Sequence, residues 1–246
     1  MHEKLKKKYG QNFLIDNNIL RKIVNLINKE SLNILEIGPG NGKLTDEIIR
    51  KKNPKKMTIV EIDKDLVKFL IGKYSEYAFV DIINDDILKF RISNKYDLVI
   101  SNLPYNISSQ ILVKLSLLNN NPKILILMFQ KEFAQRLLDP ELNSINSLIN
   151  CFYDIRLNFN VTKNCFRPIP KIDSSVLTFI KKDKNLLNES EVDNFIEFKR
   201  KLFSHKRKSL RKLLKEYNLD DNILLKLRVQ DLKLTNLLEL FRKVNF

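Results

Sequence analysis

The chain has 246 residues, and 43% of them are hydrophobic, which is enough to bury the core of one α/β domain with a smaller appendage. A formal net charge of +15 favours a polyanionic partner such as nucleic acid or a membrane surface, although a composition biased towards Lys would account for part of that charge. No apolar run reaches the roughly 18 residues of a spanning helix, and no apolar stretch follows the basic start. Cys151 and Cys165 lack metal-ligand spacing, so we expect no metal site and a cytoplasmic protein with reduced cysteines. The lack of a spanning run leads us to expect no membrane contact.

The first half of the chain alternates short runs of Ile, Val and Leu with longer stretches of helical pattern. Five runs are expected to be buried parallel strands: 33–37, 57–62, 78–83, 98–101 and 124–129. Four stretches between and after them are expected to be helices: 43–51, 65–74, 108–118 and 131–138. This alternation predicts a doubly wound α/β sheet that binds ligands at the carboxyl ends of its strands.

Two further strands are expected at 155–161 and 176–180, joined by a loop that contains Pro168 and Pro170. From about Lys184 the composition becomes polar and charged, with helical periodicity. The sequence therefore predicts a catalytic domain over 1–184 and a small all-α domain over 185–246.

A glycine-rich turn, Glu-Ile-Gly-Pro-Gly-Asn-Gly at 36–42, follows the first of the predicted parallel strands. Gly38 and Gly40 would let the backbone turn tightly and approach a ligand ahead of a helix N-terminus. The spacing differs from the G-x-G-x-x-G of dinucleotide-binding folds, so the expected anion is a methionine carboxylate rather than a pyrophosphate. The alternative is a structural turn without a ligand.

Carboxylates end the next two predicted strands. Glu61 can accept both hydroxyl protons of a ribose, and Asp86 can accept from the exocyclic amine of an adenine. Asp85 lies beside Asp86 and is an alternative for the contact to adenine. Glu61 is alternatively a solvated acid in a loop. Together with the glycine turn, these acids predict a cofactor that contains adenosine.

The sequence Asn102-Leu103-Pro104-Tyr105 follows the fourth of the parallel strands. Adenine N6 is a poor nucleophile because its lone pair is delocalised into the ring. The Asn102 amide oxygen and the Leu103 carbonyl could each accept an N6 hydrogen, Pro104 would hold the turn rigid, and Tyr105 would stack on the base. This arrangement predicts methyl transfer to N6 by positioning and electrostatic complementarity, without a nucleophilic side chain.

Five motifs, in this order, resemble those of the ribosomal RNA adenine dimethyltransferase family. They lie at 9–14 (Tyr-Gly-Gln-Asn-Phe-Leu), 36–42, 102–108, 130–132 (Gln-Lys-Glu) and 166–174 (Phe-Arg-Pro-Ile-Pro-Lys-Ile-Asp-Ser). The resemblance implies a seven-stranded, class I (Rossmann-like) S-adenosylmethionine-dependent methyltransferase sheet. It places cofactor contacts at Asn12, Leu14, Gly38, Glu61, Asp86 and Asn102.

The same resemblance implies a substrate and a cellular setting. The expected enzyme is a cytoplasmic monomer that adds two methyl groups to each of two adjacent adenosines near the 3′ end of small-subunit rRNA, in the assembling small ribosomal subunit. Phe166 would form a second wall for the target base opposite Tyr105, or would instead fill the core under its loop.

The segment 199–215 contains nine Lys or Arg residues and no acid, and its apolar residues recur at helical spacing. It is expected to be an amphipathic helix whose basic face, including Lys206, Arg207, Lys208 and Arg211, binds RNA phosphates. The alternative is a solvated surface.

Three other functions remain open at this stage. A large-subunit rRNA adenine methyltransferase of the macrolide-resistance type shares the Asn-x-Pro-Tyr and Phe-x-Pro-x-Pro patterns. A non-catalytic nucleic-acid-binding factor on the same fold would typically have lost Gly38, Glu61 or Asn102, all of which are present. A nicotinamide oxidoreductase is disfavoured by the spacing of the glycines.

Overall fold

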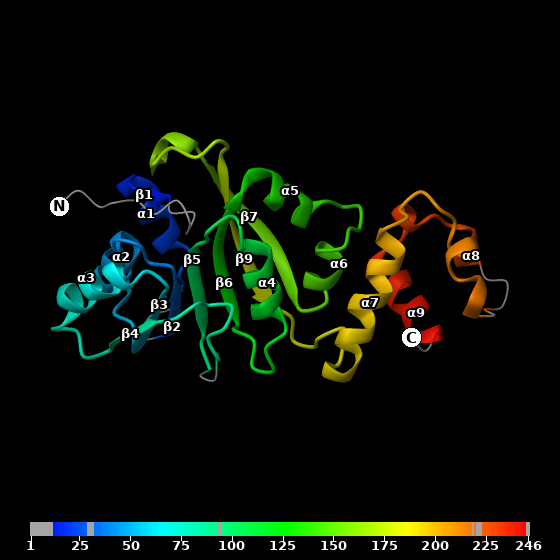
Figure 1. Cartoon of the computed structure of the whole chain (residues 1–246), viewed down its shortest axis with the longest axis horizontal. Helices are drawn as coiled ribbons and strands as arrows, with labels where there is room; N and C mark the ends of the chain where they lie inside the picture. Colours follow the sequence, from blue (N-terminus) through cyan, green and yellow to red (C-terminus); the bar gives the residue numbers. More distant parts are fainter. Residues whose placement is uncertain (1–11, 29–31, 93–94, 218, 220–222, 245–246) are drawn as a thin grey trace. The chain divides into compact units, whose positions relative to one another are not determined.

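A computed structural model describes residues 12–28, 32–92, 95–217, 219 and 223–244. Its main element is a seven-stranded sheet with the strand order β4-β3-β2-β5-β6-β9-β7 (Figure 1). The strands are β2 (Asn33–Ile37), β3 (Lys56–Glu61), β4 (Val80–Asn84), β5 (Leu98–Asn102), β6 (Ile124–Gln130), β7 (Tyr153–Val161) and β9 (Ser174–Lys181). The pairs that join β4 through β6 are parallel, and β9 is antiparallel to β6. The predicted sheet is thereby confirmed.

The four predicted helices are confirmed with small shifts of their ends. They are α2 (Lys43–Lys52), α3 (Lys64–Tyr74), α4 (Ser108–Ser116) and α5 (Lys131–Leu138). Sequence analysis missed α1 (Asn17–Asn25), although Asp16 marks its start: the side chain of Asp16 accepts hydrogen bonds from the backbone of Asn18 at 2.8 Å and Ile19 at 3.2 Å. This is an ordinary N-cap, and it was readable from the sequence.

One face of the sheet carries the core that supports the glycine turn. Ile34 of β2 is in register with Met57 of β3 and Leu98 of β5, and all three are at most 1% exposed. Since side chains alternate along a strand, every second residue points to this face. Buried residues of α1, α2 and α3 belong to the same hydrophobic cluster, so these helices are held against that face of the sheet.

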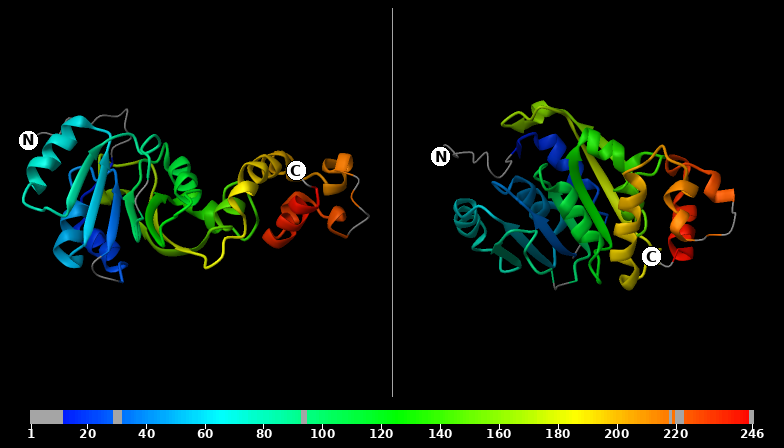
Figure 2. Two further views of the ribbon diagram at one scale, coloured as in Figure 1. Left: turned by 90° about the horizontal axis from the view of Figure 1, so that it is seen from below. Right: turned by 45° about the vertical axis from the view of Figure 1, so that its right-hand side comes forward.

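A second, two-stranded sheet joins the N-terminal segment to the loop after β7. β1 (Phe13–Leu14) is antiparallel to β8 (Phe166–Arg167), with Leu14 opposite Phe166. Figures 1 and 2 both show the blue β1–α1 region beside the yellow-green segment that carries β8. This pairing brings together segments that are about 150 residues apart in the chain.

The chain divides into two compact units, and the division differs from the expected one. The first unit runs to Ala134 and includes Ile155–Lys181, whereas the second combines Gln135–Asp154 with the chain from Lys182 onward. The segment 135–154 joins the second unit through backbone and side-chain bonds: Leu186 N donates to Cys151 O at 2.9 Å, and Lys199 Nζ donates to Ser144 O at 2.6 Å.

The second unit is helical, as expected from the composition. It contains α6 (Asn146–Ile149), α7 (Val192–Phe203), α8 (Leu210–Leu213), α9 (Leu234–Lys243) and several 3-10 turns. Phe195 and Phe198 of α7 pack against Phe241 of α9, with ring centroids 5.2 and 5.6 Å apart. These buried aromatic contacts provide the unit with a core of its own.

The prediction of one continuous basic helix over 199–215 is wrong. Helix α7 ends at Phe203, the Ser204 hydroxyl donates to the carbonyl of Lys201 at 2.8 Å, and residues 205–208 form turns before α8. A serine hydroxyl that bonds to the preceding turn competes with regular helical bonding. Lys199 is also only 6% exposed, so it is a structural residue of this unit rather than a phosphate contact.

Within the described residues, no helix combines the length and the apolar character needed to cross a membrane.

The burial of Phe166 generates a stability prediction. Its side chain is 0% exposed and lies in the core cluster of the first unit, so Phe166→Ala should lower the free energy of unfolding by about 3–5 kcal/mol in chemical denaturation. The control Phe69→Ala, at a side chain that is 45% exposed, should change it by less than about 0.5 kcal/mol. Wild-type stability of Phe166→Ala with loss of RNA methylation would contradict this placement and restore the base-wall role.

Candidate active site

A pocket lies at the carboxyl ends of four neighbouring parallel strands, β4, β3, β2 and β5. Such an edge is where α/β sheets bind their ligands, because the loops there diverge to both sides of the sheet. The pocket brings together ten of the residues predicted from the sequence: Asn12, Leu14, Gly38, Gly40, Glu61, Asp86, Asn102, Leu103, Pro104 and Tyr105. Residues 9–11 of the first motif lie outside the described residues.

The glycine turn has a backbone that other residues rarely adopt. Gly38, Gly40 and Gly42 have φ values of +61°, +61° and +79°. A side chain at Gly38 would meet no atom within 4 Å, so the backbone there faces open space, whereas one at Gly40 would come within 2.6 Å of the Phe13 ring. The turn therefore leaves room for a ligand at Gly38 and is covered by Phe13 at Gly40.

Glu61 connects the end of β3 to this turn. Its carboxylate accepts hydrogen bonds from Asp63 N at 2.9 Å and from Gly40 N at 3.4 Å, and the residue is only 5% exposed. Burial raises the pKa of Glu61 above its ordinary value, and the backbone hydrogen bonds act against that rise. The acid that sequence analysis assigned to a ribose also fixes the position of the glycine turn.

Sequence analysis missed Glu36, which also lines the pocket. Its Oε2 accepts a hydrogen bond from Thr45 Oγ1 at 2.7 Å, while its buried Oε1 has no hydrogen-bond partner among the described residues. Burial raises the pKa of Glu36 to about 8. Its signal in the sequence was an acid two residues before the first glycine, between the apolar residues Leu35 and Ile37 of the strand.

Asp85 and Asp86 both line the pocket after β4, and both already make backbone contacts. Asp85 Oδ1 accepts from Asp86 N at 2.7 Å, and Asp86 Oδ1 accepts from Leu88 N at 2.9 Å. Their neighbours Ile62 and Ile87 form apolar parts of the lining that sequence analysis did not assign to the site. An apolar residue directly after a strand-end acid was the available signal.

The side-chain amide of Asn102 has a defined orientation. Its Nδ2 donates to the backbone carbonyl of Asn12 at 2.9 Å. A carbonyl can only accept, so the amide nitrogen must be the group that faces Asn12, and Oδ1 is the acceptor on the other side. The strand beneath is anchored as well, because Ser101 Oγ donates to Ile37 O at 2.6 Å.

Tyr105 is held at its hydroxyl and at its backbone carbonyl. Its hydroxyl is 2.6 Å from Ser174 Oγ, and its backbone carbonyl accepts from Ser108 Oγ at 3.1 Å. Burial raises the pKa of Tyr105, so the hydroxyl stays neutral at physiological pH. Ser174 ends the motif at 166–174, so this contact joins two motifs that are far apart in sequence.

Phe166, the predicted second wall for the base, and the motif at 130–132 do not line the pocket of the described residues. Phe166 is fully buried in the core and has no exposed face on which a base could stack, which corresponds to the alternative that sequence analysis left open. The Gln130-Lys131-Glu132 cluster ends β6 and begins α5, and Lys131 N donates to Asp173 O at 2.9 Å. Lys131 thereby holds Asp173, the residue that precedes Ser174 at the start of β9.

Comparison with known proteins identifies the family. The family model described as "Ribosomal RNA adenine dimethylase" matches residues 2–244. The chain belongs to this family. Among similar curated proteins, "Ribosomal RNA small subunit methyltransferase A" of Mycoplasmopsis pulmonis is 42% identical over 231 residues, covering 89% of this chain and 87% of that protein. The protein of the same name from Pelagibacter ubique is 42% identical and covers 86% of this chain and 83% of its own length.

Solved structures agree with this membership of the ribosomal RNA adenine dimethylase family. A dimethyladenosine transferase from Plasmodium falciparum superposes with a TM-score of 0.81 at 26% identity, covering 95% of this chain and 98% of that one. The 23S rRNA methyltransferase ErmE superposes with a TM-score of 0.70 at 20% identity over 95% of this chain and 100% of its own. At that identity the second likeness supports the class I methyltransferase fold alone.

The cofactor of this dimethylase family member is S-adenosylmethionine, and the pocket residues fit it. The open space at Gly38 would receive a ligand against bare backbone. S-adenosylmethionine supplies an electrophilic methyl group on a sulfonium. The glycine turn with Asn12 and Leu14 would hold its methionine end, Glu61 its ribose, and Asp86 with Ile62 its adenine.

The buried position of Glu61 yields a binding prediction. Glu61→Ala removes an acceptor for charge-assisted hydrogen bonds worth about 1.5–3 kcal/mol, so affinity for S-adenosylmethionine should fall roughly tenfold or more in calorimetry. Asp65→Ala, at an exposed acid on the neighbouring helix α3, is the matched control and should bind as wild type does. Unchanged affinity in Glu61→Ala would remove this residue from the cofactor site.

Proposed function

We propose that this protein transfers methyl groups from S-adenosylmethionine to adenine N6 in small-subunit rRNA, and dimethylates two adjacent adenosines near the 3′ end. The observation that carries the proposal is the Asn102 amide at the rim of the cofactor pocket, oriented by the carbonyl of Asn12. The family and the names of the similar curated proteins support the substrate class.

The chemistry follows from what an adenine amine needs. The amide oxygen of Asn102 and the backbone carbonyl of Leu103 accept the two N6 hydrogens, which draws the lone pair out of the ring and directs it at the methyl donor. The Asn102 oxygen is preorganised because its amide nitrogen is bonded at 2.9 Å, so little reorganisation is required during reaction. No strong base is needed, because the nitrogen becomes acidic once it carries positive charge.

Tyr105 gives the base its stacking surface. Its ring is partly exposed at the pocket, and the bond from its hydroxyl to Ser174 Oγ at 2.6 Å restricts its rotation. Stacking on an immobilised ring costs less conformational entropy than stacking on a mobile one. We therefore assign Tyr105 to hold the adenine plane while Asn102 and Leu103 fix its edge.

The second unit is proposed to bind RNA. Lys206, Arg207, Lys208 and Arg211 are all exposed, and they lie in the turns after α7 and in α8. A cluster of cations on a turn can follow a phosphate backbone as well as a helix face does. The proposed substrate places the enzyme in the cytoplasm, where we expect it to act as a monomer on the assembling small subunit.

The direct test is mass spectrometry of rRNA nucleosides from cells that lack and then regain this protein. We expect N6,N6-dimethyladenosine to be lost from small-subunit rRNA and restored with the gene. Methylation that appears in large-subunit rRNA instead would contradict the proposed substrate, and the absence of any change would contradict the activity.

Asn102→Ala is expected to lower the rate of methyl transfer roughly a hundredfold at saturating cofactor, because it removes one transition-state hydrogen bond worth on the order of 3 kcal/mol. RNA affinity should be nearly unchanged. The control is Asn106→Ala, which alters an exposed residue of the same motif. Near-wild-type turnover of Asn102→Ala would refute the mechanism.

Replacing Lys206, Arg207 and Arg211 with Gln should weaken RNA binding and leave cofactor affinity intact. Each lost phosphate contact makes the slope of log affinity against log salt shallower by up to about one unit, measured across a salt series. The matched control replaces Lys55, Lys64 and Lys68, three exposed lysines of the first unit, with Gln. Equal slopes for the two variants would mean that these charges only solvate the surface.

A further inference from the structure

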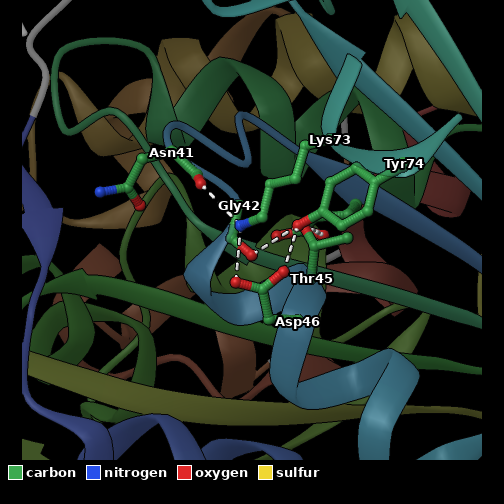
Figure 3. A network of polar contacts seen from close by, with 7 residues as sticks. Asn41, Gly42, Thr45, Asp46, Lys73 and Tyr74 are labelled. Carbon is green, nitrogen blue, oxygen red and sulfur yellow. Dashed lines mark hydrogen bonds and ion pairs between the residues drawn. The ribbon is translucent and has the colours of Figure 1, made fainter. Parts of the chain in front are cut away.

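We propose that Tyr74 is a positioning residue for cofactor binding, which holds the glycine turn from the side opposite to the pocket. The proposal rests on the cofactor assignment and is independent of which RNA is methylated. Tyr74 is the last residue of α3, and Figure 3 shows its hydroxyl directed at Gly42 and Asp46, where the turn becomes α2.

The contacts of the Tyr74 hydroxyl are short and buried. Its oxygen lies 2.8 Å from Gly42 O and 2.8 Å from Asp46 Oδ1, and the residue is only 4% exposed. Burial, and then the hydrogen bond to the Asp46 carboxylate, raise the pKa of Tyr74 far above its ordinary value. The hydroxyl therefore keeps its proton at physiological pH and shares it between Gly42 O and Asp46 Oδ1, both of which can only accept.

Lys73, the residue before Tyr74, also bonds to Asp46 and to the glycine turn. Its Nζ donates to Asp46 Oδ2 at 2.6 Å and to Asn41 O at 3.3 Å (Figure 3). Both oxygens of Asp46 are thus bonded to α3, and two successive backbone carbonyls of the turn, at Asn41 and Gly42, accept from that helix. Helix α3 fixes the place where α2 begins.

The space at Gly42 shows how closely the glycine turn fits against α3. A side chain there would come within 2.4 Å of the Tyr74 hydroxyl and 3.1 Å of Leu70 Cδ2, in addition to the strain of a φ of +79°. The Tyr74 oxygen occupies the volume that any other residue at 42 would need. The contact with α3 therefore requires glycine at position 42, whereas Gly38 faces open space at the pocket.

The side chains of this network do not line the pocket, although one of the backbone groups that they hold, at Asn41, belongs to a residue that does. Gly38, Gly40, Asn41 and Lys43 line the pocket, but Gly42 and Tyr74 do not. The turn is therefore held on one side by Glu61 through Gly40 N and on the other side by Tyr74 through Gly42 O. Since α3 follows directly after β3, Glu61 and the Tyr74 contact belong to one continuous β3–α3 segment, which holds the glycine turn at both Gly40 and Gly42.

Tyr74→Phe is the test, because it keeps the buried ring and removes only the hydroxyl. Affinity for S-adenosylhomocysteine, measured by calorimetry without RNA, should fall about three- to tenfold, which corresponds to one lost hydrogen bond. KM for S-adenosylmethionine should rise by a similar factor while kcat at saturation stays within about twofold. The backbone amides of the turn should exchange their hydrogens faster.

Tyr77→Phe is the matched control, since Tyr77 is 40% exposed and its ring contacts that of Tyr74 edge-on. It should bind the ligand as wild type does. Should Tyr74→Phe fail to fold, Lys73→Met opens the same contact from the surface, where the Lys73 side chain is 28% exposed, and the same loss of affinity is expected.

Two different results would contradict the role of Tyr74 and the cofactor assignment, respectively. A lower melting temperature with unchanged ligand affinity in Tyr74→Phe and in Lys73→Met would overturn the proposal and leave a merely structural role. Failure of the wild-type protein to bind S-adenosylhomocysteine would instead contradict the cofactor assignment on which the proposal rests.

Discussion

The active site depends on the left-handed backbone of the turn after β2. Three positive φ values in five residues turn the chain away from the strand and expose bare backbone at Gly38, where a cofactor can approach. Such a turn is conformationally free in an unfolded chain, so something else must restrict it in the folded one. Neighbours on several sides do so: the Phe13 ring covers Gly40, Glu61 accepts from its N–H, and α3 holds Asn41 and Gly42.

The buried polar groups around this turn differ in how their hydrogen bonds are satisfied. Glu61 and Asn102 have bonds to backbone that fix their orientation before any ligand arrives. Glu36 has one oxygen without a hydrogen-bond partner among the described residues, and burial shifts its pKa to about 8. At that pKa the Glu36 carboxyl is mostly protonated at neutral pH, which limits the cost of burying it with a single hydrogen-bond partner.

Much of the fold was readable from the sequence because buried parallel strands are nearly continuous apolar runs with polar residues at their ends. That pattern located Glu61, Asp86 and Asn102 correctly at one edge of the sheet. It could not decide whether Phe166 faces inward, because that depends on Leu14, its partner across the β1–β8 pair. Nor could helical spacing reveal that Ser204 ends α7, or that 135–154 packs with the chain after Lys182.

The pairing of β1 with β8 has a consequence for how the enzyme matures during synthesis. Asn12, which orients the Asn102 amide, precedes a strand whose partner lies at Phe166–Arg167, and Tyr105 is bonded to Ser174. The ribosome must therefore release about two thirds of the chain before the residues around the reacting adenine can be brought together. A nascent chain can form the inner parallel strands earlier, but it gains no competent active site until β8 and β9 have left the exit tunnel. The contacts around Asn102 and Tyr105 are thus completed only after the strands that carry the cofactor pocket have all been made.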